Sequence, residues 1–128
     1  MSKQTHAISK TKSSGNGKHR IKFRDKRRSE AGSYFSATRM GDVNLVDHKK
    51  AKGGNLKIRL KRAAFANVLT KQGYKKAKIS AVIDSQANRN FPRQNILTKG
   101  AKISTELGDA VVTNRPGREG VVNAKLLQ

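Results

Sequence analysis

The stretch that best predicts the fold spans residues 101–128 and reads AKISTELGDAVVTNRPGREGVVNAKLLQ. Short apolar runs alternate in it with turn residues, and two β-rich runs, 110–113 and 120–127, flank Pro116-Gly117. Proline presets the backbone for the second position of a turn, and glycine accepts the positive φ that a type II turn needs at its third. The pattern therefore predicts a β-hairpin whose apolar side chains contribute to a core.

Five more short runs with strand character precede this hairpin, at residues 56–60, 65–69, 77–83, 94–98 and 101–105. The first, LKIRL, alternates apolar and basic residues, which predicts a half-buried strand with Lys57 and Arg59 pointing outward. Short strands separated by Gly and Pro are typical of a small barrel or sandwich, and a closed barrel removes exposed strand edges. We predict an all-β fold in which residues 53–128 form a small closed β-barrel of about six strands.

Residues 1–52 have a different composition, with fourteen Lys and Arg, four Asp and Glu, and few large apolar residues. Ordering a chain costs about 1–2 kcal/mol per residue, which so little apolar surface cannot offset. We therefore predict that residues 1–52 form a long extended basic N-terminal arm that becomes ordered on RNA.

The whole chain is strongly basic, with 29 Lys and Arg against 8 Asp and Glu among 128 residues, a formal net charge of +21. Such a charge attracts polyanions, and the partners it indicates are nucleic acid or an anionic membrane surface. Cysteine is absent, so we expect no disulfide and no thiolate metal site. No apolar run approaches the length of a membrane span or a secretion signal, which indicates a soluble intracellular protein. Our prediction is a cytoplasmic protein without a membrane partner.

The inventory of reactive side chains does not favour an enzyme. The histidines lack metal-ligand spacing, the carboxylates of residues 53–128 occur singly, and no Gly-x-Ser-x-Gly motif is present. We predict no catalytic residue, metal, cofactor or small-molecule substrate. The groups considered are His6, His19, His48, Asp84, Glu106, Asp109 and Glu119.

The strongest binding signal is the run from Lys18 to Arg28, in which eight of eleven residues are Lys, Arg or His. Each phosphate that such a run neutralises releases condensed counterions, so it binds polyanions tightly and with a steep salt dependence. A solvated tail or a nuclear-type targeting signal is the alternative for this run. Further Arg residues fall in or beside predicted loops, where bidentate phosphate contacts are favoured, although solubilising surface charge remains the alternative there.

Several linked motifs resemble one family. They are GGNLKIR at 53–59, NR at 88–89, RQNILTKGA at 93–101, TELG at 105–108, AVVTNRPG at 110–117 and GVVNA at 120–124. The chain resembles small-subunit ribosomal protein eight of the archaeal and eukaryotic type, in its short archaeal form. The arm matches less closely, with Asn16 where the family has a second Gly and Ala31 where it has Leu.

The resemblance implies a compact β-barrel with a basic extension, bound to ribosomal RNA of the small subunit beside other ribosomal proteins, without enzymatic activity. We therefore predict a structural constituent of the small subunit that supports assembly and translation. The predicted RNA-binding residues are Lys18, Arg20, Lys22, Arg24, Lys26, Arg27, Arg28, Arg39, Asn55, Lys57, Arg59, Arg62, Arg89, Arg93, Lys99, Arg115 and Arg118.

Two other function classes compete with this prediction. A DNA-compacting protein would have the same charge, and DNA would then compete with ribosomal RNA on equal terms. A nucleic-acid-processing enzyme would need a carboxylate cluster that binds Mg²⁺, and the sequence does not provide one.

Overall fold

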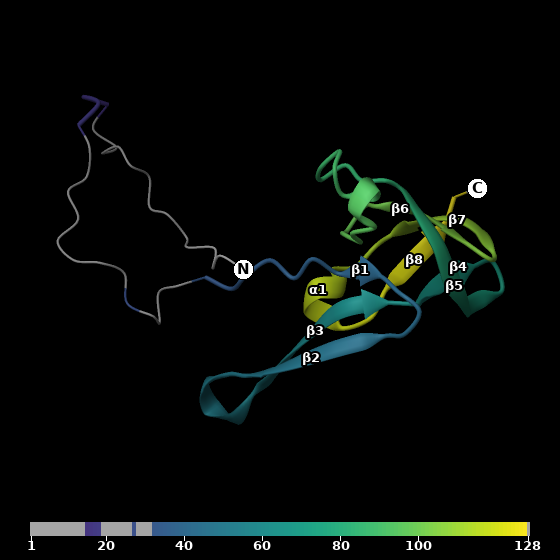
Figure 1. Ribbon diagram of the computed structural model, residues 1–128, viewed down its shortest axis with the longest axis horizontal. Coiled ribbons are helices and arrows are strands. Elements are labelled where there is room, and N and C mark those ends of the chain that lie inside the picture. Colours follow the sequence, from purple (N-terminus) through teal and green to yellow (C-terminus); the bar gives the residue numbers. More distant parts are fainter. Residues whose placement is uncertain (1–14, 19–26, 28–31, 128) are drawn as a thin grey trace. The chain divides into compact units, whose positions relative to one another are not determined.

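The computed structural model describes residues 15–18, 27 and 32–127 (Figure 1). The chain divides into two units, Met1–Phe35 and Ser36–Gln128. Lys18 and Arg27 are exposed in the first unit. All described strands and helices belong to the second unit.

Five strands of the second unit form a closed barrel in the order β4-β5-β6-β7-β8. Sequential neighbours pair antiparallel, and β8 closes the barrel by pairing parallel to β4. The prediction of an all-β fold with a small closed barrel is confirmed, although β3 lies in another sheet and the barrel has five strands. The barrel strands are β4 (Phe65–Thr70), β5 (Gly73–Asp84), β6 (Lys102–Thr105), β7 (Gly108–Val112) and β8 (Asn123–Leu126).

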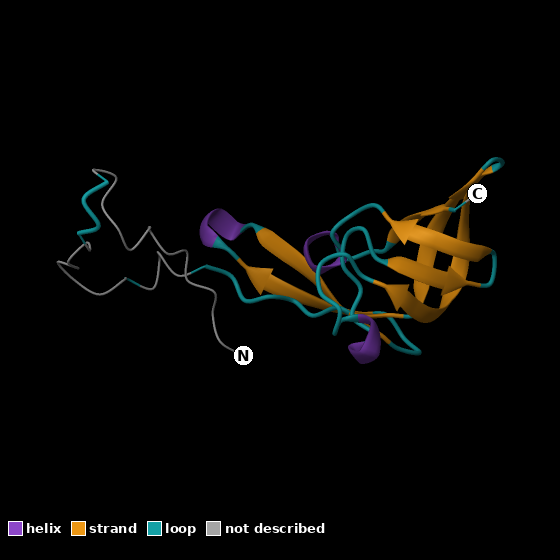
Figure 2. Ribbon diagram, turned by 90° about the horizontal axis from the view of Figure 1, so that it is seen from above, coloured by secondary structure: helices purple, strands orange, loops and turns teal. Residues whose placement is uncertain are grey.

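The other three strands form a second sheet in the order β1-β3-β2. β1 (Arg39–Met40) pairs parallel to β3 (Leu56–Ala63), and β2 (Leu45–Lys50) pairs antiparallel to it. A turn of 3-10 helix, η2 (Lys52–Gly54), connects β2 to β3, and this hairpin projects from the barrel (Figure 2). β1 and β2 fall within the predicted arm, and ordering of residues 1–52 by RNA stays a prediction.

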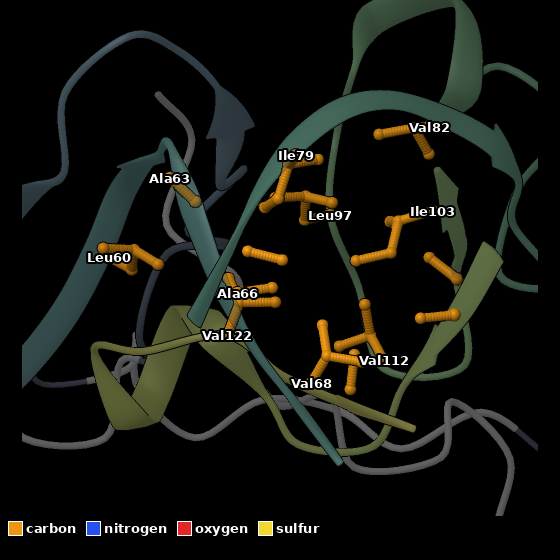
Figure 3. Packing of buried hydrophobic residues seen from close by; sticks show 14 residues of the cluster. Leu60, Ala63, Ala66, Val68, Ile79, Val82, Leu97, Ile103, Val112 and Val122 are labelled. Atoms are coloured by element: carbon orange, nitrogen blue, oxygen red, sulfur yellow. The ribbon is translucent and has the colours of Figure 1, made fainter. Parts of the chain in front are cut away.

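The barrel core is small and aliphatic, as the sparse aromatic content requires. In β4 the alternation is clear: Ala66 and Val68 are buried, whereas Phe65 and Leu69 face outward. Leu60 and Ala63 extend the core from β3 (Figure 3). The other buried members are Ala77, Ile79, Val82, Leu97, Ala101, Ile103, Ala110, Val112, Val122 and Ala124.

Six of the seven predicted strands form, and residues 94–98 do not. Their place is taken by η3 (Pro92–Gln94) and by Asn95, whose φ of 52° is left-handed. This segment instead attaches to the edge of β1. The backbone N–H of Met40 donates to the Asn95 carbonyl at 2.9 Å, and that of Leu97 donates to the Thr38 carbonyl at 2.8 Å.

The predicted β7–β8 hairpin pairing is confirmed, but its type II turn is wrong. Pro116 begins a short helix, α1 (Pro116–Glu119), a position that proline tolerates because its missing N–H is not needed there. Gly117 lies inside this helix, and the positive φ of 77° falls on Gly120, whose backbone N–H donates to the Pro116 carbonyl at 3.1 Å. α1 therefore ends at a glycine that packs against the β2–β3 hairpin.

Candidate nucleic-acid interface

A β-bulge in β3 places two consecutive basic residues on the outside of the sheet. Val46 lies opposite Leu60 and Leu45 opposite Arg62, so Lys61 is an extra residue in the register. An extra residue of this kind bends the strand and lets neighbouring side chains share one face. Lys61 and Arg62 are both exposed as a result, while Leu60 and Ala63 on either side are buried.

Register then gathers further basic residues on the same side. Lys49 lies opposite Lys57, Asp47 lies opposite Arg59, and Arg39 of β1 lies beside Arg62. Directly opposed residues share a face of a sheet, as do residues two apart along a strand. We define the cationic face as Arg39, Lys49, Lys57, Arg59, Lys61 and Arg62.

The electrostatics of the cationic face are dominated by unpaired charge. Its carboxylate, Asp47, binds Lys61 Nζ at 3.2 Å, a partly exposed ion pair of the kind that contributes little to stability. In the part of the chain that the structure describes, Arg39, Lys49, Lys57 and Arg62 have no carboxylate within ion-pair distance. The face therefore keeps a strong positive field directed at solvent.

Arg59 departs from its predicted position, because it is only 7% exposed rather than pointing freely outward. β3 is the central strand of its sheet, with β2 on one side and β1, preceded by the segment at 36–38, on the other. That segment lies close by, since the hydroxyls of Ser36 and Thr38 donate to the Leu60 carbonyl at 3.2 and 2.7 Å. Arg59 is therefore largely withdrawn from solvent, whereas Lys57, Lys61 and Arg62 of the same strand stay exposed.

The opposite face of the hairpin is occupied near its base by α1. A Cβ built on Gly120 would lie 2.5 Å from Ile58 Cγ2 and 4.0 Å from Val46 Cγ1, so backbone and side chains are in close contact there. This packing fixes the hairpin on the barrel and leaves the cationic face directed away from α1.

The remaining predicted residues of the second unit lie elsewhere. Asn55 closes the hairpin loop, where its carbonyl accepts from the Ala51 N–H at 2.7 Å. Exposed Arg89 and Arg93 belong to the loop that is attached to β1 at Asn95. The structure therefore places Arg39, Lys57, Arg59 and Arg62 on paired strands of one sheet, whereas Asn55, Arg89, Arg93, Lys99, Arg115 and Arg118 lie in loops, in turns or in the short helices η3 and α1.

Lys99 and Arg115 lie near the carboxylate of Glu119. The pKa of Glu119 is lowered chiefly by the side-chain hydrogen bond from Asn114 and then by the backbone N–H of Arg115, with smaller contributions from the two cations. The Asn114 amide donates to Glu119 Oε2 at 3.0 Å, and the Arg115 N–H donates to Oε1 at 3.2 Å. These groups stabilise the turn around α1.

The predicted arm residues are mostly outside the described part of the chain. Lys18 and Arg27 are exposed. Arg20, Lys22, Arg24, Lys26 and Arg28 lie outside the described residues, so their contact with RNA stays a prediction.

Two members of the cationic face, Lys49 and Lys61, were missed by the sequence prediction. The sequence prediction included Lys49 in the extended arm. In the structure β2 pairs with β3, and this pairing places Lys49 opposite Lys57. Lys61 was missed because a bulge has no reliable sequence signal here.

The described residues hold neither a candidate metal cluster nor a candidate membrane-spanning helix. Within them, no group of three or more His, Cys, Asp or Glu residues could hold a metal ion. Nor does this part of the chain contain a helix that is long and apolar enough to span a bilayer.

Comparison with known proteins identifies the family. A model of the family "Ribosomal protein S8e" matches residues 7–127. "Small ribosomal subunit protein eS8" of Sulfolobus acidocaldarius is 45% identical over 114 residues, which cover 88% of this chain and 89% of that protein. The protein of the same name from Sulfurisphaera tokodaii is 46% identical over 109 residues, covering 84% and 85%. The chain therefore belongs to the S8e family of ribosomal proteins.

Proposed function

We propose that this chain is a structural constituent of the small ribosomal subunit and binds ribosomal RNA through the cationic face and the basic run at 18–28. Relatives that are identical at more than two fifths of the aligned residues are named as small-subunit proteins. The S8e family is one of structural proteins rather than enzymes. The site of action is accordingly the cytoplasmic ribosome.

The observation that supports RNA binding most strongly is the arrangement of the cationic face on a rigid element. From Lys57 to Arg62 the face extends over five residue steps of β3, roughly 16 Å at the rise of a β-strand. A nucleic-acid backbone carries a phosphate about every 3.4 Å of helix axis on each strand, so several phosphates can face this surface. Backbone contacts of this kind position a protein on folded RNA without reading its sequence.

Neighbouring ribosomal proteins are proposed as further partners of the chain, in addition to RNA. DNA compaction is the competing function, because phosphate contacts alone do not distinguish DNA from RNA. If the proposal is right, the chain should bind ribosomal RNA more tightly than duplex DNA, since folded RNA presents shapes and unpaired bases that duplex DNA lacks.

The proposed function is tested by co-sedimentation of the full chain with small subunits lacking this protein, across a salt series. We expect stoichiometric binding at physiological salt that ribosomal RNA of the small subunit competes away and duplex DNA of equal mass does not. Equal competition by the two polymers would contradict the proposal and favour DNA compaction.

A further inference from the structure

We propose that the outer face of β5-β4-β8 is a stacking surface for unpaired RNA bases. The inference rests on the proposed function, in which RNA is the partner, and it specifies the form of RNA that this second surface binds. We define the aromatic–lysine face as Phe65, Leu69, Tyr74, Lys76, Lys78 and Lys125.

The register of the three strands assembles this face. Phe65 lies opposite Lys78 and Leu69 opposite Tyr74, and on the other edge Leu69 lies beside Lys125 of β8. Between these two rows lie Asn67 and its neighbours Lys76 and Asn123. Because Ala66 and Val68 point into the core, their alternating neighbours must point outward.

The aromatic residues on this face are more exposed than packing would favour. Tyr74 is 70% exposed and Phe65 is 38% exposed. The chain has only four Phe and two Tyr, so two of its six aromatic rings lie on the outside of three adjacent strands. The two rings share one face and lie four residue positions apart along β4, and exposed rings on a shared face indicate a partner that covers them.

Phe65 and Tyr74 have different roles in the proposed surface. Lys76 Nζ lies 4.5 Å from the centroid of the Phe65 ring, a cation–π contact that holds the ammonium group on the outer face. One side of Phe65 is thereby occupied. The Tyr74 ring is the more open of the two, and we assign base stacking to it first.

The charge of the face favours RNA over an apolar protein partner. Lys76, Lys78 and Lys125 have no carboxylate within ion-pair distance in the described ranges. Glu106 is hydrogen-bonded to Lys78 through the backbone, where the Glu106 N–H donates to the Lys78 carbonyl at 3.3 Å. Open rings next to unpaired lysines are the combination by which proteins bind single strands, since stacking tolerates any base while the cations neutralise the backbone.

The two surfaces should therefore discriminate between RNA forms. The cationic face has no aromatic member and contacts phosphates of paired or unpaired RNA alike. The aromatic–lysine face requires bases that are free to stack. A single-stranded loop or bulge would satisfy it, whereas a regular duplex would not.

The test uses the full chain with Tyr34→Phe, which leaves Tyr74 as the remaining tyrosine. Its ring resonances are recorded by NMR during titration with an eight-nucleotide single-stranded RNA and with a duplex of the same sequence, at salt high enough to weaken phosphate contacts. We expect upfield ring shifts with the single strand and little shift with the duplex.

Two variants separate stacking from mere surface contact. Removing one stacked base–aromatic contact costs about 1–3 kcal/mol, so Tyr74→Leu should weaken single-strand binding roughly 5- to 150-fold. Tyr74→Phe keeps the ring and should bind like the parent. Because the side chain is largely exposed, both variants should retain the far-ultraviolet dichroism of the parent.

Unchanged single-strand affinity in Tyr74→Leu, or equal ring shifts with both RNAs, would overturn the inference. Ring shifts that arise only with the protein fraction of the small subunit would also overturn it and identify a protein partner. If neither RNA binds when the titration is repeated at low salt, where phosphate contacts are strong, the proposed function itself fails. If duplex RNA still binds through Lys49 and Lys57 but Tyr74→Leu does not change the affinity for single-stranded RNA, the proposed function survives and only this inference fails.

Discussion

Gly120→Ala should disrupt the contact that fixes the β2–β3 hairpin on the barrel. Gly120 has a φ of 77°, and an added Cβ would lie 2.5 Å from Ile58 Cγ2. A separation below 3.0 Å requires movement, and Ile58 has little freedom because its branch is attached directly to Cβ within a strand. Either α1 or the hairpin must shift.

The cost has two parts that a control variant can separate. A side chain at positive φ costs about 1–2 kcal/mol, and overpacking adds about 1–3 kcal/mol, so the free energy of unfolding should fall by about 2–5 kcal/mol. Gly54 has a nearly identical φ of 76° and open space around its Cβ position. Gly54→Ala should therefore cost only about 1–2 kcal/mol.

Urea denaturation of the two variants and the parent gives the measurement. A third variant, Gly120→Ala with Ile58→Ala, should recover most of the extra loss, because the truncated side chain lacks the clashing methyl. The reasoning is refuted if Gly120→Ala is no more destabilising than Gly54→Ala, or if truncating Ile58 brings no recovery.

Three further predictions concern the core, a loop and pH. Ile103 is 0% exposed, so Ile103→Ala should lower the free energy of unfolding by about 2–5 kcal/mol and Ile103→Val by about 0.5–1.5 kcal/mol. Urea denaturation measures both values, and an equal decrease in the two variants would contradict tight packing around Ile103. Asn44 Oδ1 accepts from the buried Ala64 N–H at 2.7 Å, so Asn44→Ala should cost about 1–3 kcal/mol and Asn44→Asp, which keeps an acceptor, clearly less. The carboxylate of Glu119 has a pKa below its ordinary 4.5, so it stabilises the fold above that pH and the contribution is lost as pH falls through the lowered pKa. Urea midpoints of the parent and Glu119→Gln should therefore differ at pH 7 and converge in acid. A difference that grows in acid would mean that folding raises the pKa of Glu119 instead of lowering it.

The sequence predicts strands well because their signal is local. Alternation along residues 56–60 and 65–69 identifies β3 and β4, and the apolar runs after residue 101 identify the last three strands. The pairing of β3 is not local. Alternation does not indicate which strands pair with which. The sequence therefore predicted β3 as a barrel strand, whereas in the structure it pairs with β1 and β2.

The turn at Pro116 shows why a local signal can be ambiguous. Proline is equally compatible with the second position of a turn and with the first turn of a helix, since both need φ near −65°. Tertiary contacts decide between them: α1 packs on Ile58 through Gly120, and a Cβ on Gly117 would meet Ser36 at 3.1 Å.

The candidate site was predicted only in part for the same reason. Charge density identified Arg39, Lys57 and Arg62 as binding candidates without showing that they share a face. The addition of Lys49 depends on the pairing of β2, and that of Lys61 depends on the bulge. The alternation of LKIRL also did not indicate the burial of Arg59, which is 7% exposed although Lys57 and Lys61 of the same strand are exposed.

The salt dependence of binding to small-subunit RNA tests the central claim most directly. The variant Lys49→Gln with Lys57→Gln removes two charges from the cationic face, and Lys71→Gln with Lys102→Gln removes two exposed charges elsewhere on the barrel. If each lost lysine contacts one phosphate, the first variant should flatten the plot of log K against log salt by about 1.4–1.8, while the control keeps the slope of the parent. Equal slopes for the two variants would show that the cationic face does not bind RNA.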